Sequence, residues 1–320
     1  MSVKQRTLKS EFSLNGKGLH TGKQVTATFK PAEENFGYRI RRMDLEGSPE
    51  IPALAEYVKL MDRASCLEKD GVCVFTMEHA MAALYGCGID NCLIELSGEE
   101  FPILDGSAKY YVKEIEKVGF EEQKADRRYF TVKEQMEFCS EDGQTKITLL
   151  PDTDYNINLV VAYDSPYLQM QYATYSEKVT DFAKEIAPCR TFVFLRELEM
   201  LLQHNLIKGG DLDNAIVIVD REISQEEVNR LAKLFNHDSI EVKQGILNNL
   251  DLSLTMNRLV INCWMLSGIC LYAGVLSRDV LSRRDRVIKQ TLAWPRKCVR
   301  PSRRRKEKMF VPTWTRRPNR

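Results

Sequence analysis

Two residues that could do chemistry stand side by side at the start of a predicted helix. Glu78 and His79 lie in the segment VCVFTMEHAMAALYGCG, residues 72–88. A carboxylate can take a proton as a general base, and an imidazole can bind a metal ion. A single histidine on a helix is more often a structural residue than a ligand. By spacing alone, both interpretations of His79 therefore stay open.

Two glycine-flanked segments could bring their backbone close to a ligand. His20 lies in the turn GLHTG, residues 18–22, while Lys208, Gly209 and Gly210 form a loop before an apolar strand. Glycine allows backbone conformations and close approaches that other residues exclude. An ordinary exposed turn is the alternative for His20. The lysine–glycine loop lacks the Walker pattern of a phosphate-binding loop, and the sequence has no G-x-S-x-G, HExxH or GxGxxG motif.

Periodicity predicts the elements that position these residues. Alternating segments predict strands within residues 1–30, 38–45 and 89–98. The spacing of Met77, Met81 and Leu84 predicts a helix with Thr76 as its N-cap, ended by Gly86 or Gly88. A second helix is predicted over 107–119, with Asp105 or Ser107 as its cap and Gly119 as its end.

The second half repeats this pattern loosely. Strands are predicted in 127–138, 145–152, 155–164 and 207–220, and helices over 197–206 and 224–235. Ser224 and Glu227 have the spacing of a capping box. We therefore expect an α+β fold of two similar units, each a mixed β-sheet with packed helices. The units are predicted at 1–126 and 127–254, the second one incomplete, followed by a basic tail without a native fold at 255–320.

The composition separates the tail from the rest. The 320 residues are 43% apolar and 28% charged, which excludes a disordered chain, a collagen and a disulfide miniprotein. The net charge of +1 hides an uneven distribution, because residues 256–320 carry +14 and residues 1–255 carry −13. All three tryptophans lie in the tail and all four histidines lie before it. One evolved domain rarely divides its composition so sharply.

The cysteines and the first residues indicate the cellular compartment. The nine cysteines are scattered, odd in number and without a CxxC pair, which is typical of reduced thiols. The N-terminal MSVKQRTLKSEF has no apolar core of a signal peptide. We expect a cytoplasmic protein.

Five motifs together are more specific than any one of them. In this order and spacing, GKGLHTG, TMEHAMAALYGCGIDN, FPILDGSA, CRTFVF and IKGGDLDNAIV resemble the zinc-dependent deacetylase family of lipid A synthesis, UDP-3-O-acyl-N-acetylglucosamine deacetylase. The resemblance covers about residues 3–254. It has the character of the Bacteroidetes-type proteins in which this domain is fused to a 3-hydroxyacyl-carrier-protein dehydratase, and we expect no such second domain here.

The resemblance implies a substrate and a role for each candidate residue. The substrate would be a UDP-linked, 3-O-acylated N-acetylglucosamine, which loses acetate from its amide. The matched positions are His79 as the first zinc ligand, Glu78 as the general base, Thr191 at the oxyanion, Phe192 against the sugar, His20 near the site, and Lys208, Gly209 and Gly210 at the entrance of the acyl-chain passage. Zinc would lower the pKa of bound water to about 7 and polarise the amide carbonyl. The hydroxyl would steady the oxyanion.

The sequence departs from the family pattern after residue 254. The family takes its other two zinc ligands from a helix reading HKxxDxxGD and its general-acid histidine from a stretch ending GH, and neither motif occurs here. His237 and Asp238 lie before the expected helix and lack its spacing. A catalytic zinc needs about three protein ligands, so we expect weak zinc binding and little or no activity. A non-catalytic UDP-sugar binder is the alternative function.

A shifted reading frame explains this departure. Permitted codons from Met256 onward, read from the third base of the first codon, spell EPARHKLLDVIGDLS, and recoding Leu281–Ile288 likewise yields IATRPGH. The hypothesis is that residues from about 255 onward are an out-of-frame translation. The uncharged run Leu259–Ser277 as a membrane helix, and 300–308 as a nucleic-acid or anionic-lipid patch, are the alternatives. Both would be accidental, so neither membrane insertion nor a nucleic-acid partner is expected.

Overall fold

The computed structural model describes most of the chain up to residue 248. The described residues are 3–61, 64–129, 132–140, 143–162, 170–203, 207–235, 240–243 and 245–248. The predictions for His237 and Asp238, for the run Leu259–Ser277 and for the out-of-frame tail lie outside these residues.

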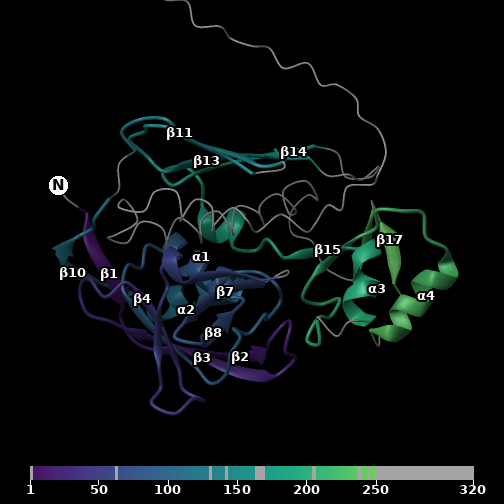
Figure 1. Ribbon diagram of the computed structural model, residues 1–320, viewed down its shortest axis with the longest axis horizontal. Helices are drawn as coiled ribbons and strands as arrows, with labels where there is room; N and C mark the ends of the chain where they lie inside the picture. Colours follow the sequence, from purple (N-terminus) through teal and green to yellow (C-terminus); the bar gives the residue numbers. More distant parts are fainter. Residues whose placement is uncertain are drawn as a thin grey trace, which may run out of the picture.

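A five-stranded mixed sheet forms the base of the first half (Figure 1). Its order is β2 (Phe12–Lys17), β3 (Gln24–Pro31), β9 (Cys92–Leu96), β4 (Tyr38–Arg42) and β5 (Glu50–Pro52). Strands β4 and β9 run parallel, and the other neighbours are antiparallel. The alternation predicted for this region holds in β3, where Val25, Ala27 and Phe29 are buried and the residues between them are not.

A smaller antiparallel sheet and a two-stranded ladder complete the first half. After a short 3-10 turn, η1 (Ala55–Tyr57), come β6 (Val58–Met61), β7 (Ala64–Lys69) and β8 (Val72–Phe75). Strand β1 (Lys4–Leu8) pairs antiparallel with β10 (Phe120–Asp126). None of the strands β5 to β8 was predicted, because residues 50–75 mix charged and apolar side chains without a clean period.

Two helices pack on one another in this half. Helix α1 (Glu78–Gly86) is buried from His79 to Leu84, so it lies inside the core rather than on its surface. The predicted cap Thr76 is wrong, since Met77 occupies the N-cap position and no side chain caps the helix. Helix α2 (Lys109–Val118) ends at Gly119, whose φ of 73° fits the predicted glycine stop.

Two hairpins follow, and Figure 1 shows them above α1. They pair β11 (Met136–Cys139) with β12 (Lys146–Leu149), and β13 (Asn156–Val161) with β14 (Gln171–Ser176). Tyr155 and Tyr175 join the second hairpin to the first half, because the Tyr155 ring lies 5.8 Å from that of Tyr85 and 6.1 Å from that of Tyr175. A single π-helical turn, η2 (Phe182–Ile186), leads onward.

The last described part is a small sheet with two helices. Its order is β15 (Phe192–Phe194), β16 (Ile216–Ile218), β18 (Ile246–Asn248) and β17 (Glu241–Lys243), with α3 (Leu195–Gln203) and α4 (Gln225–Leu234) beside it (Figure 1). The predicted capping by Ser224 is confirmed on one side, since its hydroxyl accepts from the backbone N–H of Glu227 at 3.2 Å.

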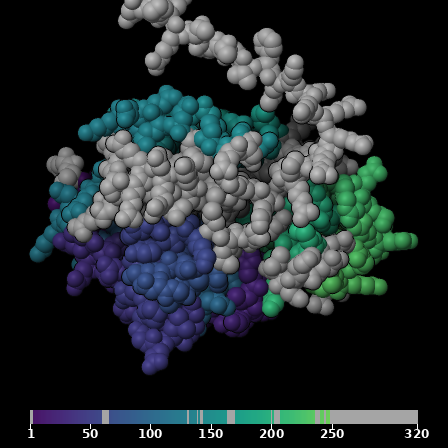
Figure 2. Space-filling model, viewed as in Figure 1, coloured from purple at the N-terminus to yellow at the C-terminus, as the bar shows by residue number. Residues whose placement is uncertain are grey.

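The α+β class with mixed sheets is confirmed, whereas the division into two similar units stays a prediction. The larger hydrophobic core gathers the first sheet, α1 and α2, but also Tyr175, Phe182 and Ile186. The smaller core lies between α3, α4 and the last sheet. Figure 2 shows the first half in purple and blue and the last described part in green at one end of the molecule. No described helix is long and apolar enough to cross a membrane.

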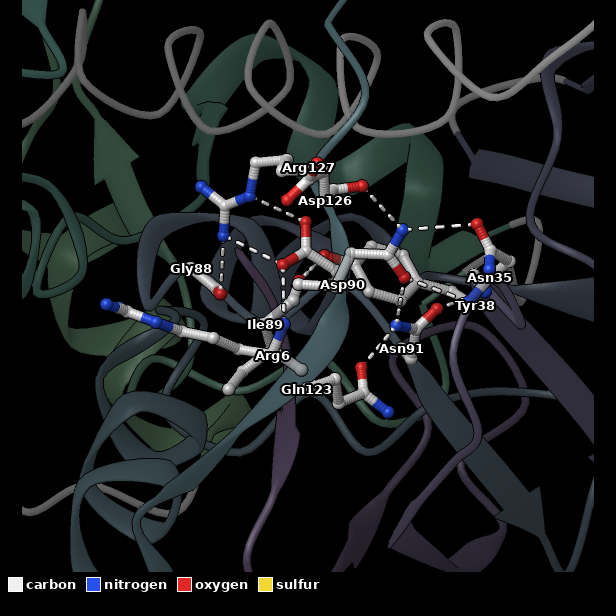
Figure 3. A network of polar contacts seen from close by, with 12 residues as sticks. Arg6, Asn35, Tyr38, Gly88, Ile89, Asp90, Asn91, Gln123, Asp126 and Arg127 are labelled. Atoms are coloured by element: carbon white, nitrogen blue, oxygen red, sulfur yellow. Dashed lines mark hydrogen bonds and ion pairs between the residues drawn. The ribbon is translucent and has the colours of Figure 1, made fainter. Parts of the chain in front are cut away.

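A polar network fixes the start of the second half onto the first (Figure 3). The Arg127 guanidinium donates to the Gly88 carbonyl at 2.8 Å and to the Asp90 carboxylate at 2.9 Å. The same carboxylate accepts from the Arg6 backbone N–H at 2.8 Å. Next to it, Asn91 is 1% exposed and donates to the side chains of Gln5 and Gln123. Segments from both ends of the first half therefore meet at residues 88–91.

Candidate active site

The Glu78–His79 pair opens helix α1. Glu78 lies in the first turn, where the helix dipole favours a negative charge. His79 is 5% exposed, and its Nδ1 atom has no hydrogen-bond partner among the described residues. Burial lowers the pKa of His79, although the nearby carboxylates of Glu78 and Asp105 oppose that shift. A buried, neutral imidazole with a free nitrogen can bind a metal ion.

The loop 102–108 brings Thr191 to the same region. The Thr191 backbone N–H donates to the Gly106 carbonyl at 2.7 Å, and the Thr191 carbonyl accepts from Ile216 at 2.9 Å. Asp105, the residue before Gly106, forms an ion pair with Arg190 at 3.6 Å. Because Asp105 also acts on His79, this loop lies between the start of α1 and the start of β15.

Phe192 is the first residue of β15. Its ring meets that of Phe194 edge to face, with 5.8 Å between the centroids and 88° between the planes. Phe192 is partly exposed, whereas Phe194 is buried. An aromatic face held in this way can pack against a sugar ring.

His20 lies in the turn between β2 and β3. The turn closes with a hydrogen bond from the Gly22 N–H to the Gly18 carbonyl at 3.0 Å. Gly22 adopts a φ of 67°, which suits glycine. The backbone N–H of His20 donates to the Glu100 carboxylate at 2.9 Å. His20 is partly exposed in a turn whose backbone is fixed.

The Lys208–Gly210 loop packs directly on this turn. The Gly209 N–H donates to the Leu19 carbonyl at 3.0 Å. A Cβ atom on Gly209 would lie 2.0 Å from the Gly18 carbonyl oxygen, so only glycine fits there. Lys208 itself is exposed. His20 and the loop, which are almost 190 residues apart, thus form one side of the candidate site.

Two clusters therefore hold the predicted residues. One contains Glu78, His79, Thr191 and Phe192 around the loop 102–108, and the other contains His20 with Lys208, Gly209 and Gly210. Asn214 joins them, because its side chain donates to the Gly209 carbonyl at 2.9 Å and its own carbonyl touches Gly106.

The described residues supply only part of a metal site. They contain no group of three or more histidine, cysteine, aspartate or glutamate side chains that could hold an ion. His79 fits one ligand, since its nitrogen is free and buried. A catalytic zinc takes about three protein ligands, so this part of the chain alone does not complete such a site.

Four residues that frame the site were not among the predicted site residues. They are Glu100, Asp105, Arg190 and Asn214. Asp105 was expected only as a helix cap, but Ala108 occupies the N-cap position of α2. The Asp105 carboxylate instead accepts from the Ser107 hydroxyl at 2.7 Å, and that hydroxyl accepts from the Lys109 backbone N–H. Glu100 precedes an apolar stretch, and no motif or periodicity around it indicates a role in the site. Their partners lie far away in the sequence, so spacing could not reveal them.

Comparison with known proteins identifies the family of this chain. The model of the family described as LpxC: UDP-3-O-acyl N-acetylglycosamine deacetylase matches residues 5–237. The chain belongs to this family. It is similar to the UDP-3-O-acyl-N-acetylglucosamine deacetylase of Marinobacter nauticus, with 40% identity over 261 residues, 81% of this chain and 83% of the relative.

Two relatives are fusions. The bifunctional enzyme LpxC/FabZ of Bacteroides thetaiotaomicron is 52% identical over 248 residues, which is 77% of this chain and 54% of that protein. The protein of the same description from Porphyromonas gingivalis is 49% identical over 247 residues, 77% of this chain and 53% of that protein. The chain thus spans about half the length of these fused relatives.

Proposed function

We propose that this chain carries the site of a deacetylase that acts on UDP-linked, 3-O-acylated N-acetylglucosamine. The observation that supports this most strongly is the buried Nδ1 atom of His79, next to Glu78 in the sequence, which has no hydrogen-bond partner among the described residues. An imidazole ligand, a carboxylate and a hydroxyl are the groups that amide hydrolysis needs at one place. The relatives named as deacetylases support the substrate class.

Each residue has a proposed task in this chemistry. Glu78 takes the proton from the attacking water, and the Thr191 hydroxyl donates to the oxyanion that forms on the amide carbonyl. His79 is the proposed zinc ligand. Phe192 is proposed to contact the sugar from the same side as Thr191. His20 and the loop of Lys208, Gly209 and Gly210 are proposed to contact the substrate from the other side.

We further propose that hydrolysis by this chain is slow or absent. The sequence holds neither HKxxDxxGD nor the later histidine motif, so we expect His79 to have too few partners to retain zinc. Binding of the UDP-sugar without turnover is the expected behaviour. The described cysteines form no disulfide with one another. The cytoplasmic location is proposed from the scattered, odd set of nine cysteines.

The purified full chain provides the test. Metal analysis should find much less than one zinc per chain, and acetate release from the acylated UDP-sugar should stay near background. Calorimetry should still detect binding of that substrate, weakened in Phe192→Ala and Lys208→Ala but not in Lys233→Ala on α4. Stoichiometric zinc with steady acetate release would overturn the low-activity proposal, and the lack of any substrate binding would overturn the binding role.

The gene offers an independent test of the frameshift hypothesis, which would explain the missing motifs. The nucleotide sequence around codons 250–290 shows whether the shifted frame is open and encodes the missing helix. Stop codons in that frame would contradict the frameshift hypothesis.

A further inference from the structure

Glu100 is a buried carboxylate with four hydrogen-bond donors around it. It is 2% exposed. One oxygen accepts from the His20 N–H and from the Thr76 hydroxyl, each at 2.9 Å. The other accepts from the Thr21 N–H at 2.9 Å and from the Thr21 hydroxyl at 2.8 Å. All four donors are uncharged, and the two oxygens of the side chain accept two hydrogen bonds each.

The Thr76 contact is unusual because of the backbone at that residue. Thr76 has a φ of 57°, a left-handed conformation that is strained for a β-branched side chain. Such residues persist only where their surroundings hold them in place, and they cluster at functional sites. Thr76 is 3% exposed and lies two residues before Glu78. Its hydroxyl bond to Glu100 therefore helps to set where helix α1 begins.

The other contacts of Glu100 fix the opposite side of the candidate site. Room for the carboxylate exists because residue 18 is glycine, since a Cβ atom there would lie 2.3 Å from a Glu100 oxygen. The turn that Glu100 holds is the one on which Gly209 packs. One carboxylate thus links the start of α1 to the segment that contacts the Lys208–Gly210 loop.

We propose that Glu100 is a positioning residue of this site. It fixes the His20 turn and the start of the Glu78–His79 helix relative to each other, so that the two sides of the substrate site have one geometry. Glu100 acts through Thr76, Thr21 and the turn backbone. The inference rests on the proposed substrate role of these segments, but its structural part can be measured separately.

The first test measures amide hydrogen exchange of His20 and Thr21 in the full chain. Thr76→Val removes one hydroxyl and leaves the His20 and Thr21 amides chemically unchanged. It should still speed the exchange of these two amides severalfold. Glu100→Gln places an amide donor against donors and should speed it about tenfold or more. Thr76→Ser keeps the hydroxyl and should restore the slow exchange. Amides of the β13–β14 hairpin serve as the internal reference.

The second test measures affinity for the 3-O-acylated UDP-N-acetylglucosamine by calorimetry. Thr76→Val should weaken substrate binding severalfold, and Thr76→Ser should bind as the unmodified chain does. The affinities are compared at temperatures where thermal unfolding shows all three proteins to be folded. Unchanged exchange at His20 and Thr21 in both Thr76→Val and Glu100→Gln would overturn the coupling. Faster exchange with unchanged affinity would overturn the positioning role. If the unmodified chain does not bind the substrate, the proposed function fails, and the exchange result alone still decides whether Glu100 couples the two segments.

Discussion

At the scale of single residues, the candidate site depends on glycines where two backbones touch. Gly106 has a φ of 76°, and a Cβ atom there would lie 1.9 Å from the Asn214 carbonyl oxygen. Its own carbonyl accepts from Thr191. The backbone of one half thus sets the place of Thr191 in the other half, with no side chain between them.

Gly106→Ala should lower the free energy of unfolding by more than the strain of a left-handed alanine alone. Gly47→Ala is the matched control, because Gly47 has a φ of 74° and open space around its Cβ position. We expect about 1–2 kcal/mol for the control, from backbone strain. The clash at Gly106 should add about 1–3 kcal/mol. Urea unfolding measures both, and equal losses in the two variants would contradict the contact.

The described cysteines should differ widely in reactivity. Burial raises the pKa of the Cys66 thiol to about 12 and also raises that of Cys92, whereas Cys139 is exposed on β11. Only the thiolate reacts with alkylating agents. Iodoacetamide at pH 8 should therefore label Cys139 well before Cys66 or Cys92, as read by peptide mass spectrometry. In urea the three should react alike, and early labelling of Cys66 in the folded chain would contradict its burial.

At the scale of elements, ion pairs link three strands across one face of the five-stranded sheet. Glu95 on β9 pairs with Lys30 on β3 at 2.7 Å and with Arg41 on β4 at 2.9 Å. Its side chain is 15% exposed, so solvent screens this network less than ordinary surface pairs. The hydrogen bond from Lys30 holds the pKa of Glu95 below its ordinary value, and Arg41 contributes to the same shift.

Stability should therefore depend on pH partly through Glu95. A carboxylate whose pKa is lower in the folded state stabilises the fold above its unfolded pKa, about 4.5, and this contribution is lost as the pH falls through the folded value. Glu95→Gln should thus cost about 1 kcal/mol or less at pH 6, and the cost should shrink as the pH falls below about 4.5. Urea unfolding across that range measures it. Glu11→Gln, whose side chain is 65% exposed and 3.9 Å from Lys30, should change little.

Local signals predicted some elements well and others wrongly. Helix α4 begins after Ser224 as expected, because a capping hydroxyl and its N–H partner lie three residues apart. The same reasoning failed at Thr76, whose hydroxyl binds Glu100, 24 residues away, instead of the helix that follows. Strands β6 to β8 were missed, since their pairing with one another decides their structure more than their own sequence does.

The candidate site was predictable only in part, for the same reason. Spacing alone left His79 and His20 open, and the residue roles came from the combination of five motifs. Asn214 and Glu100, which join the segments, act on partners that no local pattern connects to them.

At the scale of the whole molecule, Asn91 forms hydrogen bonds to several separate segments in the polar network of Figure 3. Its side-chain oxygen accepts from the Gly37 N–H at 2.8 Å, and its side-chain nitrogen donates to Gln5 at 2.9 Å and to Gln123 at 2.7 Å. These partners belong to the N-terminal strand, the segment before β4, and β10. A buried amide with three partners makes their positions mutually dependent.

Asn91→Leu should destabilise the whole chain rather than one strand. The substitution leaves buried polar groups of its partners without hydrogen bonds, at a cost of about 3 kcal/mol or more. Urea unfolding followed by circular dichroism measures the loss. Asn158→Leu is the control, because Asn158 is exposed on β13 and its side-chain oxygen accepts from the Tyr172 hydroxyl at 3.3 Å. A comparable loss of unfolding free energy in both variants would contradict the stabilising role of the Asn91 hydrogen bonds.

The backbone contact between Gly18 and Gly209 also has a consequence for biosynthesis. At about 5–20 residues per second, the ribosome adds residue 209 roughly 10–40 s after residue 18. During that interval the nascent turn has Glu100 as a partner but not the loop that covers it. The N-terminal half must therefore wait, with one flank of the candidate site uncovered, until residue 209 has been added.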